Sequence, residues 1–287
     1  MKGRSLIPEL PEVETVRREL EPWLNQRQIL KAGLVDAKPG PKYAELERAI
    51  GQKILGVNRR GKFLLLRLDG GDELVIHLGM TGIISPKEPQ KHVRVALELS
   101  GEGNTRLYFQ DVRRFGRFLV VKAGDYQSLP TLKTLGVEPL SEDFKPLDFW
   151  QTLQASKMPI KSYLLSQRPV AGVGNIYADE ALWLAKIHPL RPSSSLSQME
   201  AHELVSAIQK ILSQSIEAQG TTLNDYRTVN GEVGAYLSEL KAYGHAGDAC
   251  PRCQNLILKT SLGGRGTHFC PQCQRVTNNF AGQGCKP

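Results

Sequence analysis

Residues 250–273 read CPRCQNLILKTSLGGRGTHFCPQC, and the spacing of their four cysteines specifies a compact module. Cys250 and Cys253 are followed by sixteen residues and then by Cys270 and Cys273, a spacing typical of modules that fold around one tetrahedral zinc ion. Two thiolates separated by two residues can face one ion from a tight turn, and a module of about 40 residues has too small a core to fold without a metal. The spacing therefore predicts a zinc finger with these four cysteines as ligands.

The residues between the two cysteine pairs predict a β-hairpin. The segment NLILKTSLGGRGTHF alternates apolar and polar residues, and Gly263 and Gly264 suit a tight turn. Arg265 would then lie at the tip of the hairpin. All five cysteines of the chain lie at or after position 250, which favours one local metal site over a network of disulfides. Cys285 lies outside the spacing, and we expect it to be a free thiol.

The N-terminal half predicts one helix followed by a sheet-rich domain. Apolar residues recur at steps of three and four between about Pro11 and Leu24, which predicts a helix. Its buried face would hold Val13, Val16, Leu20 and Leu24, with Glu12, Glu14, Arg17 and Arg18 elsewhere. From Ile29 to about Lys122, short strand-like runs alternate with glycines and charged turns, which predicts a sandwich. The clearest runs are KFLLLRL, ELVIHLG, RVALELS, RLYFQ and RFLVVKA.

The second half predicts helices. Residues 124–146 are rich in Pro, Ser and Gly without sustained periodicity, and we place a domain connection there. Ser197 and Glu200 form a capping-box pattern before apolar residues at helical spacing, and this helix should end at Gly220. The glycines of GVGNIYADEALW lead into another helix, and a glycine-led helix start can seat a phosphate. A tight turn into an ordinary core helix explains the same glycines equally well.

Composition limits the class of protein. The chain has 287 residues, of which 40% are hydrophobic, enough for two domains and a small appendage. The excess of 37 Lys and Arg over 29 Asp and Glu gives a charge of +8, which favours a polyanionic partner, although many basic proteins bind no nucleic acid. The N-terminal residues contain no apolar run long enough for a signal peptide, and nowhere are there about 18 consecutive apolar residues. We therefore expect a cytoplasmic protein without a membrane anchor.

Nine motifs follow one another along residues 8–275. They are PELPEVETVRREL, RRGKFLLL, IHLGMTG, KHVRV, DVRRFGRF, IKSYLL, AGVGNIYADEALWLAKIHP, QGTTLNDY and GRGTHFCPQCQ. In this order they closely resemble the formamidopyrimidine-DNA glycosylase family. The related endonuclease VIII branch is similar in outline, but the opening PELPEV in place of its PEGPE favours the purine-directed branch.

The resemblance implies an α+β fold in three parts. These are an N-terminal eight-stranded β-sandwich flanked by helices (residues 8–130), a helix-two-turns-helix domain (131–245) and a C-terminal zinc finger (246–280), with DNA bound between them. Residues 1–7 would be a leader or a mis-assigned start. The resemblance also implies damaged double-stranded DNA as the partner, one structural zinc ion, a monomer, and a cytoplasmic, nucleoid-associated location in a bacterium.

The resemblance assigns the nucleophile to the secondary amine of an N-terminal proline, and the matching residue is Pro8. A terminal amine titrates near about 8 and lysine near about 10.4, so about 10% of the terminal amine is free base at neutral pH. Residues 1–7 would place the Pro8 nitrogen in a peptide bond, where it has no available lone pair. We therefore expect translation to begin at the codon of Ile7, or the leader to be removed. Without the resemblance, Pro8 would only begin a helix.

Three further residues match catalytic positions of the family. Glu9 matches the carboxylate that protonates the leaving base or the sugar ring oxygen. Lys62 matches a lysine that contacts phosphate and assists β-elimination, and Arg265 matches the zinc-finger arginine that grips the phosphate at the lesion. By residue type alone, Glu9 would be a surface residue favoured by the helix dipole and Lys62 a solvated charge at a strand edge.

Other residues match positions that contact DNA. Met80, Arg113 and Phe115 match the set that fills the space left when the damaged nucleotide leaves the stack. On residue type alone, Met80 and Phe115 would be core residues. Phosphate-contacting positions are matched by His77, His92, Lys157 and Asn175, of which Lys157 aligns only approximately. The loop QGTTLNDY, residues 219–226, matches the one that covers the flipped base.

The expected activity is excision of 8-oxoguanine and formamidopyrimidines from duplex DNA, followed by β,δ-elimination at the abasic site. Two alternatives stay open at this point. A chain with a blocked Pro8 would be a non-catalytic protein that binds lesions or nucleic acid. A preference for oxidised pyrimidines would place the chain with the endonuclease VIII branch.

Overall fold

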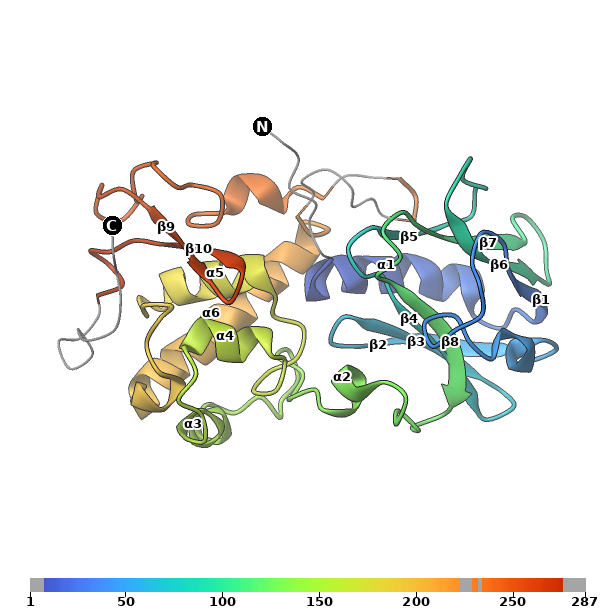
Figure 1. Ribbon diagram of the computed structural model, residues 1–287, viewed down its shortest axis with the longest axis horizontal. Helices are drawn as coiled ribbons and strands as arrows, with labels where there is room; N and C mark the ends of the chain where they lie inside the picture. Colours follow the sequence, from blue (N-terminus) through green and yellow to red (C-terminus); the bar gives the residue numbers. More distant parts are fainter. Residues whose placement is uncertain (1–7, 222–228, 232–233, 276–287) are drawn as a thin grey trace. The chain divides into compact units, whose positions relative to one another are not determined.

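The computed structural model describes residues 8–221, 229–231 and 234–275 (Figure 1). The chain forms two compact units: unit 1 comprises Met1–Lys133 and Ser215–Leu237, and unit 2 comprises Thr134–Gln214 and Ser238–Pro287. The proposed leader, residues 222–226 of the predicted loop, and Cys285 lie outside the described residues. Among the described helices, none is long and apolar enough to cross a membrane.

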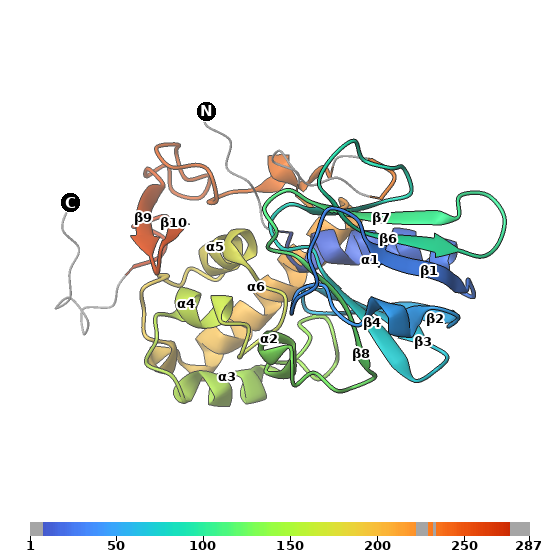
Figure 2. The same ribbon diagram turned by 45° about the vertical axis from the view of Figure 1, so that its right-hand side comes forward.

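Unit 1 contains two four-stranded antiparallel sheets that lie face to face (Figure 2). One sheet has the order β1-β6-β7-β5 and the other the order β2-β3-β4-β8. The strand bounds are β1 Ile29–Leu34, β2 Ile54–Arg60, β3 Phe63–Leu68, β4 Asp72–His77, β5 Gly82–Ser85, β6 Val93–Leu99, β7 Arg106–Asp111 and β8 Arg117–Lys122. The expected eight-stranded sandwich is therefore confirmed.

Alternating side chains of these strands form the core of the sandwich. Leu64, Leu66 and Leu68 of β3 point to the same side, because successive side chains of a strand face opposite ways. They join alternate residues of the other strands in one hydrophobic cluster, together with the apolar stripe of the first helix. The short helical turns η1, Leu46–Ala49, and α2, Pro130–Lys133, also belong to unit 1.

Helix α1 spans Leu10–Leu24, in agreement with the predicted helix. Its apolar stripe is buried as expected, and a capping box between Glu9 and Glu12 closes its N-terminus. The expectation that the acidic residues lie away from the buried face is wrong for Glu12 and Glu14, which are 2% and 9% exposed. Each of them accepts hydrogen bonds from groups distant in the sequence, and these partners replace water.

Unit 2 is helical and ends in the two-stranded ribbon of the cysteine module. Its helices are α3 Pro146–Gln154, α4 Ile160–Leu165, α5 Asn175–Leu184 and most of α6 Gln198–Glu217, with the short helical turn η2 Ser193–Ser195. The helical turn η3 Tyr236–Glu239 spans the boundary between the two units. The predicted capping box of α6 is present, because Ser197 N donates to Glu200 Oε2 and Glu200 N donates to Ser197 Oγ. The ribbon pairs β9, Leu258–Leu262, with β10, Arg265–Phe269.

Candidate active site and metal centre

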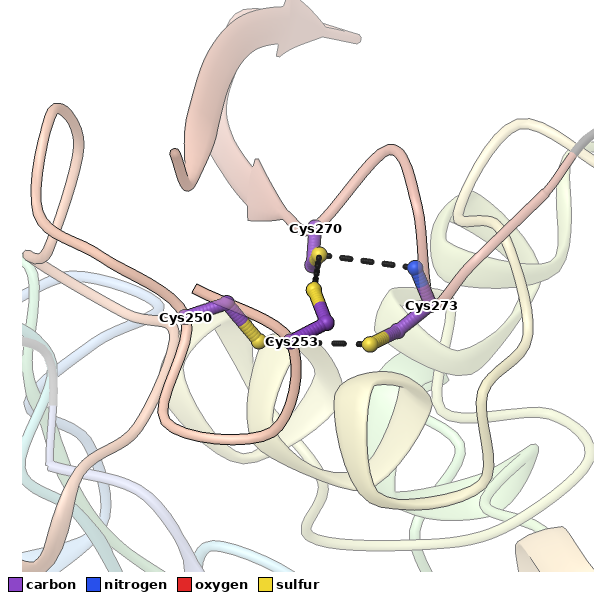
Figure 3. Close-up of side chains that lie close together, drawn as sticks. All are labelled: Cys250, Cys253, Cys270 and Cys273. Atoms are coloured by element: carbon purple, nitrogen blue, oxygen red, sulfur yellow. Dashed lines mark hydrogen bonds between the residues drawn. The ribbon is translucent and has the colours of Figure 1, made fainter. Parts of the chain in front are cut away.

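The four predicted zinc ligands gather at one point of unit 2 (Figure 3). The sulfur atoms of Cys250, Cys253, Cys270 and Cys273 all lie within 4.8 Å of one another. The Cys253 and Cys270 sulfurs are 3.4 Å apart, and those of Cys250 and Cys273 are 4.0 Å apart. A tetrahedral zinc ion with bonds of about 2.3 Å places its sulfurs about 3.8 Å apart. The cluster therefore fits one zinc ion.

The same distances exclude disulfides among these four cysteines. A disulfide joins its sulfurs at about 2.05 Å, whereas all four thiols are free. Cys250 and Cys270 are buried, and the others are partly exposed. The expectation of one local metal site in place of disulfides is confirmed, with zinc as the ion that a four-thiolate site selects.

The predicted hairpin is also present, with Arg265 at its tip. Gly263 and Gly264 have positive φ angles of 55° and 74°, as a tight two-residue turn requires. Arg265 begins β10 directly after this turn, opposite Leu262, and its side chain is exposed. A cation that stands on a short hairpin is suited to bind an anionic group.

One face of helix α5 seats this hairpin. Asn175 Nδ2 donates to the carbonyl oxygen of Gly266 at 3.1 Å. One turn further on, Asp179 Oδ2 accepts from the backbone N–H of His268 at 2.9 Å, and the His268 ring nitrogen Nδ1 lies 3.1 Å from the same oxygen. The helix therefore fixes the residues that directly follow Arg265.

Lys161 of α4 completes this seat, although the sequence interpretation missed it. Its Nζ lies 2.7 Å from Asp179 Oδ1, and both side chains are fully buried. The same nitrogen donates to Gly266 O and Thr267 Oγ1, each at 2.9 Å. A buried charge is stable only when it is paired and hydrogen-bonded. This pair therefore restricts the backbone beside Arg265.

Lys157, the other lysine of this region, has a different setting. It is exposed in the connection before α4 and does not join the group that seats the hairpin. The segment around Lys157 matches the motifs of the family only approximately, and no interaction in the described part of the chain assigns a role to this side chain.

Unit 1 brings two predicted site residues, Lys62 and His77, to one end of a sheet, beside Arg117. Lys62 lies in the turn before β3, His77 ends β4, and Arg117 begins β8. The pairing of Phe63 with His77 and of His77 with Arg117 places these residues at the same end. Lys62 and Arg117 give this end of the sheet a positive charge, because the pairing of neighbouring strands brings both of them beside His77.

His77 is a neutral hydrogen-bonding group in this setting. Burial, together with the nearby charges of Lys62 and Arg117, lowers its pKa to about 4. Its Nδ1 accepts from the backbone N–H of Gly79 at 3.1 Å, so the proton of the neutral ring lies on Nε2. The ring packs on Phe63 at 4.6 Å between centroids. A neutral Nε2–H can donate to an anion.

Met80 and Phe115 lie on two turns that touch each other. A side chain at Gly79 would come within 2.5 Å of the backbone nitrogen of Gly116, which explains the glycine and its positive φ. Buried Asp111 accepts from Gly116 N at 2.7 Å and from Thr81 Oγ1 at 2.6 Å. One carboxylate therefore fastens both turns.

The side chains on these turns are available for contact. Phe115 is 49% exposed, so the interpretation of this residue as part of the core is wrong. Arg113 lies over its ring at 5.0 Å, and Lys42 lies at 5.7 Å. His92 is held beside the same loop, because its carbonyl accepts from the backbone N–H of Asp111 at 3.0 Å.

Helix α1 begins at the same end of the sandwich. Glu14 Oε2 accepts a hydrogen bond from Arg59 Nε of β2 at 3.0 Å. Further along α1, Glu21 Oε2 accepts a hydrogen bond from the backbone N–H of Val57. The N-terminus of α1 therefore points toward the turn that carries Lys62. Pro8 is buried at this start, and Glu9 is 2% exposed.

Glu12 links this start to another part of unit 1. Its Oε2 accepts from Glu9 N at 2.8 Å, and its Oε1 accepts from Thr221 N at 2.7 Å. Thr221 is 1% exposed, and Gly220 before it has a φ of 85°. A side chain at Gly220 would lie 2.9 Å from Glu12 Oε1. Glu12 thus holds the first residues of the predicted covering loop against the start of α1.

The predicted site residues fall into two groups, one in each unit. Unit 1 carries Pro8, Glu9, Lys62, His77, Met80, His92, Arg113 and Phe115; unit 2 carries Lys157, Asn175, Arg265 and the four cysteines. The sequence interpretation missed Glu12, Asp111, Lys161, Asp179 and Glu180. The sequence held a signal for two of them, because Asp179 and Glu180 are adjacent acids in an otherwise apolar helix. In the structure, all residues from Ile176 to Trp183 are buried.

Three family models match the chain in sequence order. The formamidopyrimidine-DNA glycosylase N-terminal domain matches residues 7–118. The formamidopyrimidine-DNA glycosylase H2TH domain matches residues 135–227, and a zinc finger found in FPG and IleRS matches residues 247–276.

Curated relatives and solved structures agree with these matches. The formamidopyrimidine-DNA glycosylase of Thermus thermophilus is 49% identical over 93% of this chain and 98% of its own length, and that of Deinococcus radiodurans is 46% identical over 93% and 97%. The crystal structure of the Thermus thermophilus MutM (Fpg) protein has a TM-score of 0.87 at 47% identity, covering 93% of this chain and 98% of that one. The Lactococcus lactis Fpg bound to DNA with an abasic site has a TM-score of 0.83 at 36% identity, covering 94% and 100%.

His77 should stay uncharged down to pH values near 4. Its pKa of about 4 lies below the ordinary 6.5 because of burial, so between these values the folded chain binds fewer protons than the unfolded chain. The contribution of His77 to the free energy of unfolding therefore decreases as the pH falls through this window. Nitrogen NMR of the ring, assigned with His77→Gln, should show Nε2–H and no titration between pH 5 and 8; a midpoint near 6.5 would contradict the assignment.

Replacing Glu12 with Gln should destabilise the chain by about 1–3 kcal/mol, because an amide can offer only one oxygen to the two backbone N–H groups. The free energy of unfolding in urea measures this loss. Glu203→Gln on the exposed face of α6 is the matched control and should change stability by less than about 0.5 kcal/mol. Equal stability of the two variants would show that the Glu12 bridge contributes nothing.

Proposed function

The chain belongs to the formamidopyrimidine-DNA glycosylase family, and from this we propose how its own residues carry out the reaction. It is a base-excision repair enzyme for oxidised purines, with DNA glycosylase activity and the abasic-site lyase activity typical of the family. The observation that carries the assignment of the nucleophile is the position of Pro8 and Glu9. They begin α1 at the end of the sandwich to which Lys62 and His77 also belong.

We assign the nucleophile to the ring nitrogen of Pro8, with a free amine. Its lone pair attacks the sugar C1′ as the bond from C1′ to the damaged base breaks, and the base leaves with that electron pair and takes up a proton. The Pro8 nitrogen then loses its proton, and its lone pair forms a double bond to C1′ as the bond from C1′ to the ring oxygen breaks. The ring oxygen takes up a proton, which leaves an iminium between Pro8 and the opened sugar. Because a secondary amine forms a permanently cationic iminium, the same intermediate serves base removal and strand cleavage.

This chemistry requires a chain that begins at Pro8. An amide nitrogen within the sequence Ile7–Pro8 has no lone pair to donate, so residues 1–7 must be absent from the active enzyme. The helix start favours the reaction, since the positive end of the helix dipole disfavours an ammonium and favours the free base.

Glu9 is the acid and base beside this nucleophile. Its backbone nitrogen is fixed by Glu12, and its side chain accepts from the first turn of α1. A carboxyl held at this position can protonate the leaving base or the sugar ring oxygen and later take up a proton. Elimination then removes a proton from C2′ of the iminium and expels the 3′ phosphate, and a second elimination expels the 5′ phosphate.

Cations stabilise the phosphates that leave. Lys62 is suited to the first elimination because its turn lies beside the start of α1. Arg265 is suited to the second because its guanidinium can hold two phosphate oxygens at once. We assign further phosphate contacts to His77, His92, Asn175 and, with the least support, Lys157.

Removal of a nucleotide from the stack leaves a space of base size. We propose that Met80, Arg113 and Phe115 fill it, because they lie on two turns held together by Asp111 and Gly79. The exposure of Phe115 and the cations over its ring support insertion into DNA. The start of the covering loop at Thr221 is held by Glu12.

The partner is duplex DNA that contains 8-oxoguanine or a formamidopyrimidine, as in solved complexes of related proteins with Fapy-dG or 8-oxoguanine analogues. We assign catalysis to residues 8–130, DNA binding to 131–245 and the zinc finger to 246–280. The enzyme acts as a monomer in the bacterial nucleoid. Zinc, when bound to the four cysteines, supplies the rigidity that the small module lacks.

Borohydride trapping tests the nucleophile. A chain that begins at Pro8 should form a covalent adduct with DNA containing 8-oxoguanine, and peptide mapping should locate the adduct at Pro8, because borohydride reduces the iminium. The same chain with residues 1–7 retained is the matched control and should bind the DNA without an adduct. Equal trapping of both chains contradicts the assignment, and faster excision of thymine glycol than of 8-oxoguanine would favour a pyrimidine-directed enzyme.

Replacing Arg265 with Ala should weaken binding to DNA with an abasic site by about 10- to 100-fold, because a hydrogen bond to a charged group contributes about 1.5–3 kcal/mol. Fluorescence anisotropy at constant salt measures the affinity. Lys259→Ala in the same hairpin is the control for loss of one positive charge and should have the smaller effect. Unchanged affinity of the Arg265 variant would count against its contact with phosphate.

A further inference from the structure

The zinc module contains an arginine that stacks on a helix of unit 2. Arg252 lies inside the first turn, between Cys250 and Cys253, and its guanidinium carbon is 3.7 Å from the centre of the Trp183 ring. Its Nη2 also donates to the carbonyl oxygen of Trp183. An arginine held by both the face of a ring and a carbonyl has little freedom, so the turn is fastened to the end of α5.

The Trp183 ring also packs beside two of the ligand cysteines. The side chain is 8% exposed and packs in one apolar cluster with Cys250 and Cys270. Its Nε1 is buried and has no hydrogen-bond partner of ordinary length among the described residues. The groups that face the Cys250 sulfur are the backbone N–H groups of Arg252 and Cys253 and the Trp183 side chain.

The helix places Trp183 in line with the residues that seat the hairpin. Asn175, Asp179 and Trp183 follow one another at intervals of four residues, so they share one face of α5. The first two bind the segment after Arg265, and the third meets the opposite side of the module, at Arg252. The face therefore reaches from the tip of the hairpin to the metal ligands.

A zinc centre with four thiolates is stabilised by neighbouring N–H donors and positive charges. Four thiolates and one zinc ion carry a net charge of about −2, and N–H donors around the sulfurs stabilise that charge. Trp183 offers one such donor from a buried position, and Arg252 brings a positive charge to the same turn. An apolar ring in place of the indole would fill the space but donate nothing.

We propose that Trp183 and Arg252 form an outer clamp on the zinc centre, in which the indole N–H donates to the sulfur of Cys250 and the guanidinium holds the ring against the cysteine turn. The clamp slows loss of the ion. It involves the metal module and helix α5, and it does not depend on the identity of the DNA lesion or on the nucleophile.

The rate of zinc release tests the clamp. Purified zinc-loaded protein is mixed with an excess of a chelating dye, and release is followed by absorbance. Trp183→Phe keeps the ring that stacks on Arg252 but removes the N–H, and Arg252→Gln removes the cation from an exposed position. We expect each to release zinc about 10- to 100-fold faster, the loss of affinity typical when an outer partner of a metal ligand is removed.

Matched controls separate the clamp from general loosening of the chain. Trp150→Phe removes an indole N–H that is bound to the carbonyl of Leu196, away from the metal, and Arg168→Gln removes an exposed arginine of unit 2. Both should release zinc at the rate of the unaltered chain. A wild-type rate in either the Trp183 or the Arg252 variant overturns the proposal, as does equal acceleration in the controls.

Cobalt substitution provides a readout that packing alone would not change. The sulfur-to-cobalt charge-transfer band reports the electron density on the thiolates, which a donated hydrogen bond reduces. Trp183→Phe should shift this band, whereas Trp150→Phe should leave it in place. An unshifted band in folded Trp183→Phe protein, with its four thiolates still bound to cobalt, shows that the indole does not donate to Cys250.

Discussion

Buried carboxylates that accept backbone N–H groups hold four segments of this molecule in place. Glu12 binds the nitrogens of Glu9 and Thr221, and Asp111 binds that of Gly116. Asp179 binds the nitrogen of His268, and Glu180 binds three consecutive nitrogens, of Lys241, Ala242 and Tyr243, at 2.7–2.9 Å. Each contact joins segments that are far apart in the sequence or that turn sharply. Because a loop buried without acceptors would lose the hydrogen bonds it makes to water, these carboxylates decide which loops can pack against the helices and sheets.

A carboxylate holds a buried backbone segment more strongly than a neutral acceptor does, but burial of its charge costs free energy. A carboxylate can take several N–H donors at once, and bonds to a charged group are about twice as strong as neutral ones. Burial opposes the charge, and for Glu180 it raises the pKa even though three backbone N–H groups lower it. The buried charge of Asp179 is stabilised by the ammonium of Lys161, whose Nζ lies 2.7 Å from Asp179 Oδ1. Removing one member of such a pair leaves an uncompensated charge, so the geometry around Arg265 is specified more tightly than apolar packing would specify it.

The sequence predicts those parts of the molecule that depend on local patterns. Cysteine spacing identifies the metal ligands, the glycine pair identifies the hairpin, and the clearest apolar runs correspond to β3, β4, β6, β7 and β8. The remaining strands β1, β2 and β5 each contain a glycine, which interrupts the pattern of apolar side chains that identifies a strand. Glu12 and Lys161 could not be identified in the same way, because their partners are 209 and 105 residues away, at Thr221 and Gly266. Phe115 would count as core by residue type, yet it is exposed because it stands on a turn that Asp111 holds from below.

The position that we propose for the nucleophile, at Pro8, follows from the same anchoring. A terminal amine at the end of a flexible chain would sample many orientations, and each productive encounter would require that freedom to be lost. The hydrogen bond from Glu9 N to Glu12 restricts this freedom, because the nitrogen of Glu9 belongs to the peptide bond that follows Pro8. The capping box fixes the carboxyl of Glu9 on the same turn, so acid and amine are oriented by one helix start. A lysine side chain could reach the same carbon, but it would bring four flexible bonds and a pKa about two units higher. An anchored terminal proline, as we propose for Pro8, would therefore supply both the free base and the orientation that the reaction requires.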